Sequence, residues 1–120
     1  MRAVLRRLHS PDVDDLETWA PESGACFGVL VQAFVGPQNG KGEESFDFTV
    51  CSPEWLARRH GRNAAVLGRH HLLLFDYDFD EVRRAIESVI NSAEGQNWQE
   101  IASKIARHGK WEFEDYNPDS

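Results

Sequence analysis

Residues 26–35 read CFGVLVQAFV, residues 36–42 read GPQNGKG and residues 46–51 read FDFTVC, and these three pieces decide the fold. The first is apolar at nearly every position, which predicts a central strand covered on both faces. The second is rich in glycine and contains an Asn-Gly pair, which predicts a hairpin loop. The third alternates apolar and polar side chains, as a strand with one inward face does. Together they predict an antiparallel strand pair.

Each of the two paired segments carries one of the two cysteines of the chain, Cys26 and Cys51. Symmetric pairing of the strands would set the two thiols near each other. Buried free thiols remain the favoured interpretation over a functional disulfide, because cysteine is among the residues most often buried. No metal-ligand spacing such as CxxC is present, and a reducing compartment fits both cysteines.

A short helix is expected directly after the second strand. Ser52 is a typical N-cap, Pro53 suits the first helical position, and Gly61 suits the end of the helix. We expect this helix to turn Trp55 and Leu56 inward.

Two further helices are predicted from apolar residues that recur at steps of three and four. Asp78 and Glu81 have capping-box spacing at the start of the first helix, as Asn97 and Glu100 have at the second, and Gly95 separates them. Their inner faces comprise Phe79, Val82, Ile86, Val89, Ile90 and Ala93, then Trp98, Ile101, Ala102, Ile105 and Ala106. The short connection predicts an antiparallel helix pair across one face of the sheet.

Residues 1–9 and 71–75 read as two more strands. Strands come mostly before helices, without βαβ alternation, which indicates the α+β class. We therefore expect an antiparallel sheet of about four strands, with a short helix and a C-terminal antiparallel helix pair packed on one face. A length of 120 residues fits a single domain over residues 1–120.

The chain is acidic, with 20 Asp and Glu against 13 Lys and Arg and a formal net charge of -7. This sign disfavours nucleic acid and anionic membranes as partners, and it speeds encounter with a basic protein. We find neither a signal-peptide pattern nor an apolar run long enough to cross a bilayer, so the expected location is the cytoplasm. Within this acidic chain, residues 58–69 hold four arginines and no acid, and we expect them to fold back against acidic neighbours.

Metal-dependent catalysis is the first enzymatic alternative. It would use His60, His70, His71 and the acidic run from Asp76 to Glu81. Adjacent residues at the start of a strand point to opposite faces, so His70 and His71 are not expected to reach one metal. The acids of the run are better explained as helix-capping groups. We expect no metal site and no cofactor.

A hydrolytic triad is the second enzymatic alternative, since Ser52, His70 and Asp76 have the required residue types. No nucleophile elbow surrounds Ser52, and its place at a helix start accounts for it. The sequence therefore predicts a protein that is not an enzyme.

Residues 111–116 alternate aromatic and acidic side chains. As a strand, they would place Trp111, Phe113 and Asp115 on one face and the remaining three on the other. The favoured interpretation docks the aromatics on the core and leaves the acids in solvent. The alternative makes the acids and Tyr116 a mimic of an anionic ligand.

Several segments together resemble the immunity protein 8 family of bacterial polymorphic toxin systems. They are residues 8–12, 46–56, 68–71 and 109–116, with Trp98 and residues 100–102. The resemblance implies an α+β domain, encoded beside a toxin gene, that binds the C-terminal effector domain of the toxin and blocks it. It implies no enzymatic role and offers no catalytic residues to carry over, and nucleases are frequent toxins in such systems.

The leading hypothesis is a stoichiometric toxin inhibitor, either a monomer or a small homo-oligomer, and its runner-up is the metal-dependent enzyme described above. A tryptophan among acids is typical of an interface anchor with steering charges, although a solvated acidic loop with Trp19 tucked in explains the same residues. The expected partner-binding residues are Asp12, Asp14, Asp15, Glu17, Trp19, Glu43, Glu44, Glu114 and Asp115. Among them, the loop between Asp12 and Glu22, with Glu43 and Glu44, is the preferred surface.

Overall fold

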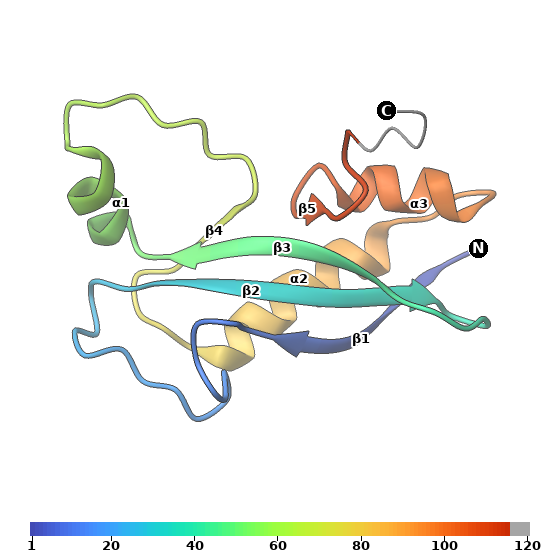
Figure 1. The fold of residues 1–120 in the computed structure, drawn as a ribbon, viewed down its shortest axis with the longest axis horizontal. Helices are drawn as coiled ribbons and strands as arrows, with labels where there is room; N and C mark the ends of the chain where they lie inside the picture. The colour runs from blue at the N-terminus through green and yellow to red at the C-terminus, as the bar shows by residue number, and fades with distance from the viewer. Residues whose placement is uncertain (116–120) are drawn as a thin grey trace.

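A computed structural model of the chain describes residues 1–115 as a sheet with helices on both of its faces (Figure 1). The elements in chain order are β1 (Ala3–His9), β2 (Gly28–Pro37), β3 (Glu44–Cys51), α1 (Pro53–His60), β4 (His71–Leu73), α2 (Phe79–Ser92), α3 (Trp98–Ile105) and β5 (Lys110–Trp111). The fold is α+β, as predicted from the order of the elements.

The sheet has the strand order β1-β2-β3-β4, and β5 pairs with β3 beside β4. The β1–β2 and β2–β3 pairs are antiparallel. A short hairpin loop joins β2 to β3, whereas the long loop at residues 10–27 joins β1 to β2. β4 differs from the prediction of an antiparallel sheet, because it runs parallel to β3. The helix α1 and the loop after it carry the chain back to Thr49, so that β4 pairs with the last three residues of β3, and they form the crossover that a parallel pair requires.

Only one face of β2 is fully covered, so the prediction of a strand buried on both faces was wrong. Val31, Ala33 and Val35 are completely buried, whereas Leu30 and Phe34, which point to the other face, are half-buried. We call the face of Val31 the inner face of the sheet and the face of Leu30 the outer face. The continuous apolar run arose because the outer face also carries apolar side chains, which helices do not fully cover.

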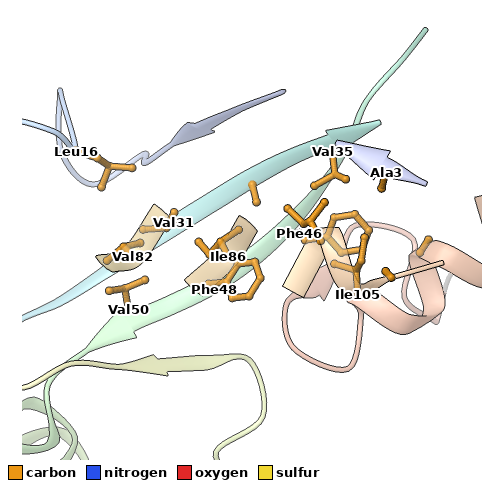
Figure 2. Packing of buried hydrophobic residues seen from close by; sticks show 14 of the residues in the cluster. Ala3, Leu16, Val31, Val35, Phe46, Phe48, Val50, Val82, Ile86 and Ile105 are labelled. Atoms are coloured by element: carbon orange, nitrogen blue, oxygen red, sulfur yellow. The ribbon is translucent and has the colours of Figure 1, made fainter. Parts of the chain in front are cut away.

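The helices α2 and α3 cover the inner face and complete the core (Figure 2). Their predicted caps are present, since the Asp78 carboxylate accepts hydrogen bonds from the N–H of Asp80 and Glu81, and Asn97 Oδ1 accepts one from Glu100 N at 2.9 Å. α2 ends at Ser92, three residues before Gly95. The predicted apolar stripes point inward, with Val82, Ile86, Ile90, Ala93, Ile101, Ala102, Ile105 and Ala106 buried.

The helix α1 lies against the opposite, outer face of the sheet. A Cβ atom at Gly28 would overlap the indole ring of Trp55, and the side of Gly28 that faces Trp55 is opposite to that of Val29. The predicted cap is confirmed, because the Ser52 hydroxyl accepts from Trp55 N at 3.2 Å and from Phe27 N at 3.1 Å. Trp55 thus turns inward onto the sheet, as expected, but Trp55 and Leu56 are only half-buried.

The strand register separates the two cysteines. Gly28 lies opposite Cys51, so Cys26 falls two residues beyond the paired part of β2. The register is therefore shifted by two residues from the one that would have placed Cys26 opposite Cys51, and both cysteines are free. Burial raises the pKa of the Cys51 thiol to about 11, which makes it unreactive at neutral pH.

Candidate functional site

The loop between β1 and β2 begins by completing the sheet edge. Asp12 Oδ2 accepts a hydrogen bond from Leu30 N at 2.9 Å, beyond the point where β1 stops pairing with β2. The buried Ser10 hydroxyl in turn accepts from Asp12 N at 3.1 Å. Asp12, one of the predicted partner-binding residues, therefore has a role within the fold.

The next acids of this loop point into solvent. Asp14, Asp15 and Glu17 are exposed, and of their carboxylates only that of Asp15 accepts a hydrogen bond in the described structure, from Glu17 N at 2.9 Å. Trp19 is half-buried, and its ring meets that of Tyr77 edge to face at a centroid distance of 4.7 Å. The loop thus presents three carboxylates above a docked tryptophan.

Tyr77 also fixes the loop through its hydroxyl group. The Tyr77 hydroxyl donates to the Leu16 carbonyl oxygen at 2.6 Å, while the Leu16 side chain enters the core. Burial, together with the nearby Asp15 and Asp78 charges, raises the pKa of Tyr77 to about 12. The acidic loop is consequently anchored at its middle rather than free along its length.

The two acids after the hairpin loop have partners within the chain. Glu43 forms an ion pair with Arg7 at 2.9 Å, and Glu44 Oε1 accepts from Trp111 Nε1 at 2.7 Å. Glu43 is on the surface, whereas Glu44 is half-buried beneath the indole. A partner could contact Glu43 without disturbing the fold, but Glu44 contributes to it.

The C-terminal segment forms a strand only over Lys110–Trp111, and turns follow, so the two faces of an extended strand do not form. Trp111 stacks on Phe46 at 6.3 Å, in agreement with docking of an aromatic on the core, whereas Phe113 is 40% exposed. Glu114 forms an ion pair with Arg69 at 2.6 Å and its side chain is only 18% exposed, so the expectation that the acids lie in solvent was wrong for Glu114. Asp115 is exposed at a positive φ of 61°, and Tyr116 lies outside the described residues.

The three histidines of the proposed metal-dependent enzyme have different surroundings. His60 is exposed on α1, His70 Nε2 lies 3.3 Å from the Ala106 carbonyl oxygen, and His71 Nδ1 lies 3.0 Å from the Arg69 carbonyl oxygen. Asp78 and its neighbours begin α2. Among residues 1–115, no three His, Cys, Asp or Glu side chains are arranged to hold a metal ion.

The basic interval folds against acids, as predicted. Arg58 and Arg62 both contact Glu54, and Arg62 makes the shorter contact at 2.8 Å. Hydrogen bonding and charge from Arg62, with a smaller effect of Arg58, lower the pKa of Glu54. With Arg69 bound to Glu114, three of the four arginines in this interval have a carboxylate partner.

A cavity of about 670 Å³ opens on the outer face of the sheet, between α1 and the loop at residues 61–70. Leu30 of β2, Thr49 of β3 and His71 of β4 line its sheet side, and Trp55 and Leu67 line its other walls. Sequence reasoning missed this site. Its one signal was the apolar pair at positions 66 and 67 within a stretch otherwise rich in arginine and glycine.

None of the helices in residues 1–115 combines the length and the apolar character that a bilayer crossing requires. Comparison with curated proteins and with solved structures found no match. The family model described as Immunity protein 8 matches residues 3–116, which is nearly the whole chain and includes the sheet, the helices and both acidic segments. The α+β fold agrees with this match, and the chain belongs to the immunity protein 8 family.

Proposed function

We propose that this protein neutralises one cognate toxin by stoichiometric binding to the C-terminal effector domain of that toxin. The family match over residues 3–116 is the observation that carries the proposal, because immunity proteins act by binding a toxin. We further propose that the chain acts as one domain over residues 1–120, as a monomer or small oligomer, in the cytoplasm of the producing cell.

The acidic surface supports a basic effector domain, such as that of a nuclease. A protein that handles nucleic acid presents cationic groups to phosphates, and a net charge of -7 attracts such a surface. Among the acids of the loop, the carboxylates of Asp14 and Glu17 are exposed and accept no hydrogen bond within residues 1–115, and Glu17 has a charge interaction with Arg83. Asp15, Glu43 and Asp115 extend this acidic surface.

Co-expression tests the function directly. Cells that produce the effector domain of the adjacent toxin gene are expected to survive when this protein is produced with it, and the two chains are expected to co-purify in a fixed ratio. An unrelated immunity protein of similar charge is the control for non-specific effects. Neither rescue nor co-purification would contradict the proposal.

Charge reversal tests the acidic loop. The double substitution Asp14→Lys and Glu17→Lys is expected to slow toxin association more at low salt than at high salt, because long-range attraction is screened by ions. Glu87→Lys with Glu94→Lys changes the net charge equally and serves as the matched control, since it removes only exposed ion pairs. Equal association rates for the two double variants would remove this loop from the binding surface.

A further inference from the structure

The outer-face cavity has a volume of about 670 Å³ and is open to solvent. The inner face of the sheet is filled by α2 and α3, whereas on the outer face α1 packs against Gly28, at one end of β2. Beside α1, the half-buried Leu30 and Thr49 form the floor of the cavity. The cavity is therefore a concave continuation of the sheet surface.

One positive charge in the wall of this cavity is uncompensated. Arg58, Arg62 and Arg69 each contact a carboxylate, but Arg59 joins no ion pair within residues 1–115. Its guanidinium instead lies 5.4 Å from the ring centroid of Trp55, so cation and aromatic surface are presented together.

The other ionisable groups in the lining are His60, His71 and Asp12. His71 Nδ1 lies against the carbonyl oxygens of Gly68 and Arg69, so the ring is held by its own loop. The Asp12 carboxylate accepts a hydrogen bond from Leu30 N and is held at the sheet edge. Arg59 is therefore the charged side chain of the lining that has no polar partner within residues 1–115.

The loop that forms the outer wall displays apolar side chains to solvent. Leu67 is 93% exposed and Val66 is 40% exposed, although both line the cavity. Every residue from 61 to 69 is exposed. Apolar side chains held on the rim of a cavity become covered when a protein segment enters it, and Trp and Arg are the residue types that dominate such interfaces.

Resting on the proposed function, we propose that this cavity receives an acidic segment of the toxin effector domain. An apolar side chain of that segment packs between Trp55 and Leu67, and a neighbouring carboxylate pairs with Arg59. The acidic loop and the cavity would then bind different parts of the toxin. The acidic loop attracts a basic part, and the cavity binds an acidic part. A second copy of this chain is a poorer occupant, since two chains of charge -7 repel each other.

Binding of the purified effector domain to single variants tests the anchor. Arg59→Glu and Leu67→Asp are each expected to weaken binding by at least about tenfold, the effect of removing a contact at the centre of an interface. Arg107→Glu and Phe75→Asp are matched controls, because both residues are exposed and outside the lining of the cavity. Circular dichroism of all four variants checks that they remain folded.

A charge swap identifies the occupant. Hydrogen exchange of the complex locates the toxin segment that becomes protected, and replacing its acid by lysine is expected to restore binding to Arg59→Glu. Tighter rather than weaker binding of Arg59→Glu to the unaltered effector domain would overturn the acidic occupant.

The remaining outcomes separate the two proposals. If the unaltered protein does not bind the effector domain, the proposed function fails. If it binds and all four variants bind equally well, the function stands and the cavity proposal fails. If sedimentation of the isolated protein shows a dimer that Leu67→Asp dissociates, the occupant is a second copy of the chain, which also overturns the proposal.

Discussion

The two faces of the sheet have different tasks, although the same strands supply both. On the inner face, Val31, Val35 and Phe46 are completely buried against α2 and α3. On the outer face, Leu30 and Thr49 are half-buried and border an open cavity. The difference shows that an apolar strand run does not require two covered faces, and we propose that the second face receives a partner.

Removal of an inner-face side chain has the largest expected effect. Phe46→Ala would leave a void beneath Trp111 and should lower the free energy of unfolding by about 3–5 kcal/mol. Urea denaturation measures the loss. Phe75→Ala, at an 81% exposed position, is the control, and equal losses in the two variants would contradict the distinction between buried and exposed positions.

The second-largest effect on stability is expected at Ser52, which connects β2 to the start of α1. The buried Ser52 hydroxyl accepts from Phe27 N and Trp55 N, so Ser52→Ala leaves two backbone donors without this acceptor. A loss of about 1–3 kcal/mol in the free energy of unfolding is expected. Ser88→Ala on the exposed side of α2 controls for loss of a hydroxyl. An unchanged melting curve for Ser52→Ala would show that water replaces the hydroxyl at this site.

A substitution beneath α1 tests how firmly the outer face is covered. Gly28→Ala forces Trp55 aside and should cost about 1–3 kcal/mol, near the lower end because Trp55 is half-buried and has room to move. Gly68→Ala is the control, since no atom lies within 4 Å of its added Cβ.

The same variant has a chemical readout at Cys51, which lies opposite Gly28. With its pKa raised to about 11, this thiol is about 0.1% ionised at pH 8, so iodoacetamide should modify it slowly in the unaltered protein. Displacement of α1 in Gly28→Ala is expected to lower this pKa and increase the rate. An unchanged rate, measured by mass spectrometry, would mean that α1 remains in place.

The smallest effect on stability is expected at the cavity rim. Leu67→Ser removes a side chain that is 93% exposed and should change the free energy of unfolding by no more than about 0.5 kcal/mol. Thermal unfolding checks this value. A larger decrease in the free energy of unfolding would mean that Leu67 stabilises the loop, which would contradict its assignment to a partner-binding surface.

Local patterns predicted most of the secondary structure, including the N-caps Ser52, Asp78 and Asn97 and the buried stripes of α2 and α3. They did so because capping and helical periodicity depend on residues within about one turn of each other. The acids of the candidate surface could also be named from sequence. The sequence could not show which of these acids already have a partner within the fold. The partners of Asp12 and Glu114 lie 18 and 45 positions away in the chain.

By itself, the sequence determined the α+β class, the helix starts, the hairpin and the acidity of the chain, since each depends on composition or on neighbouring residues. Only the tertiary structure decided that β4 runs parallel to β3, that α1 crosses to the outer face and that Arg59 is the arginine of residues 58–69 without a carboxylate partner. These features arise where segments distant in the chain meet. Their energies come from packing and charge pairing across space, which no local pattern of residues records.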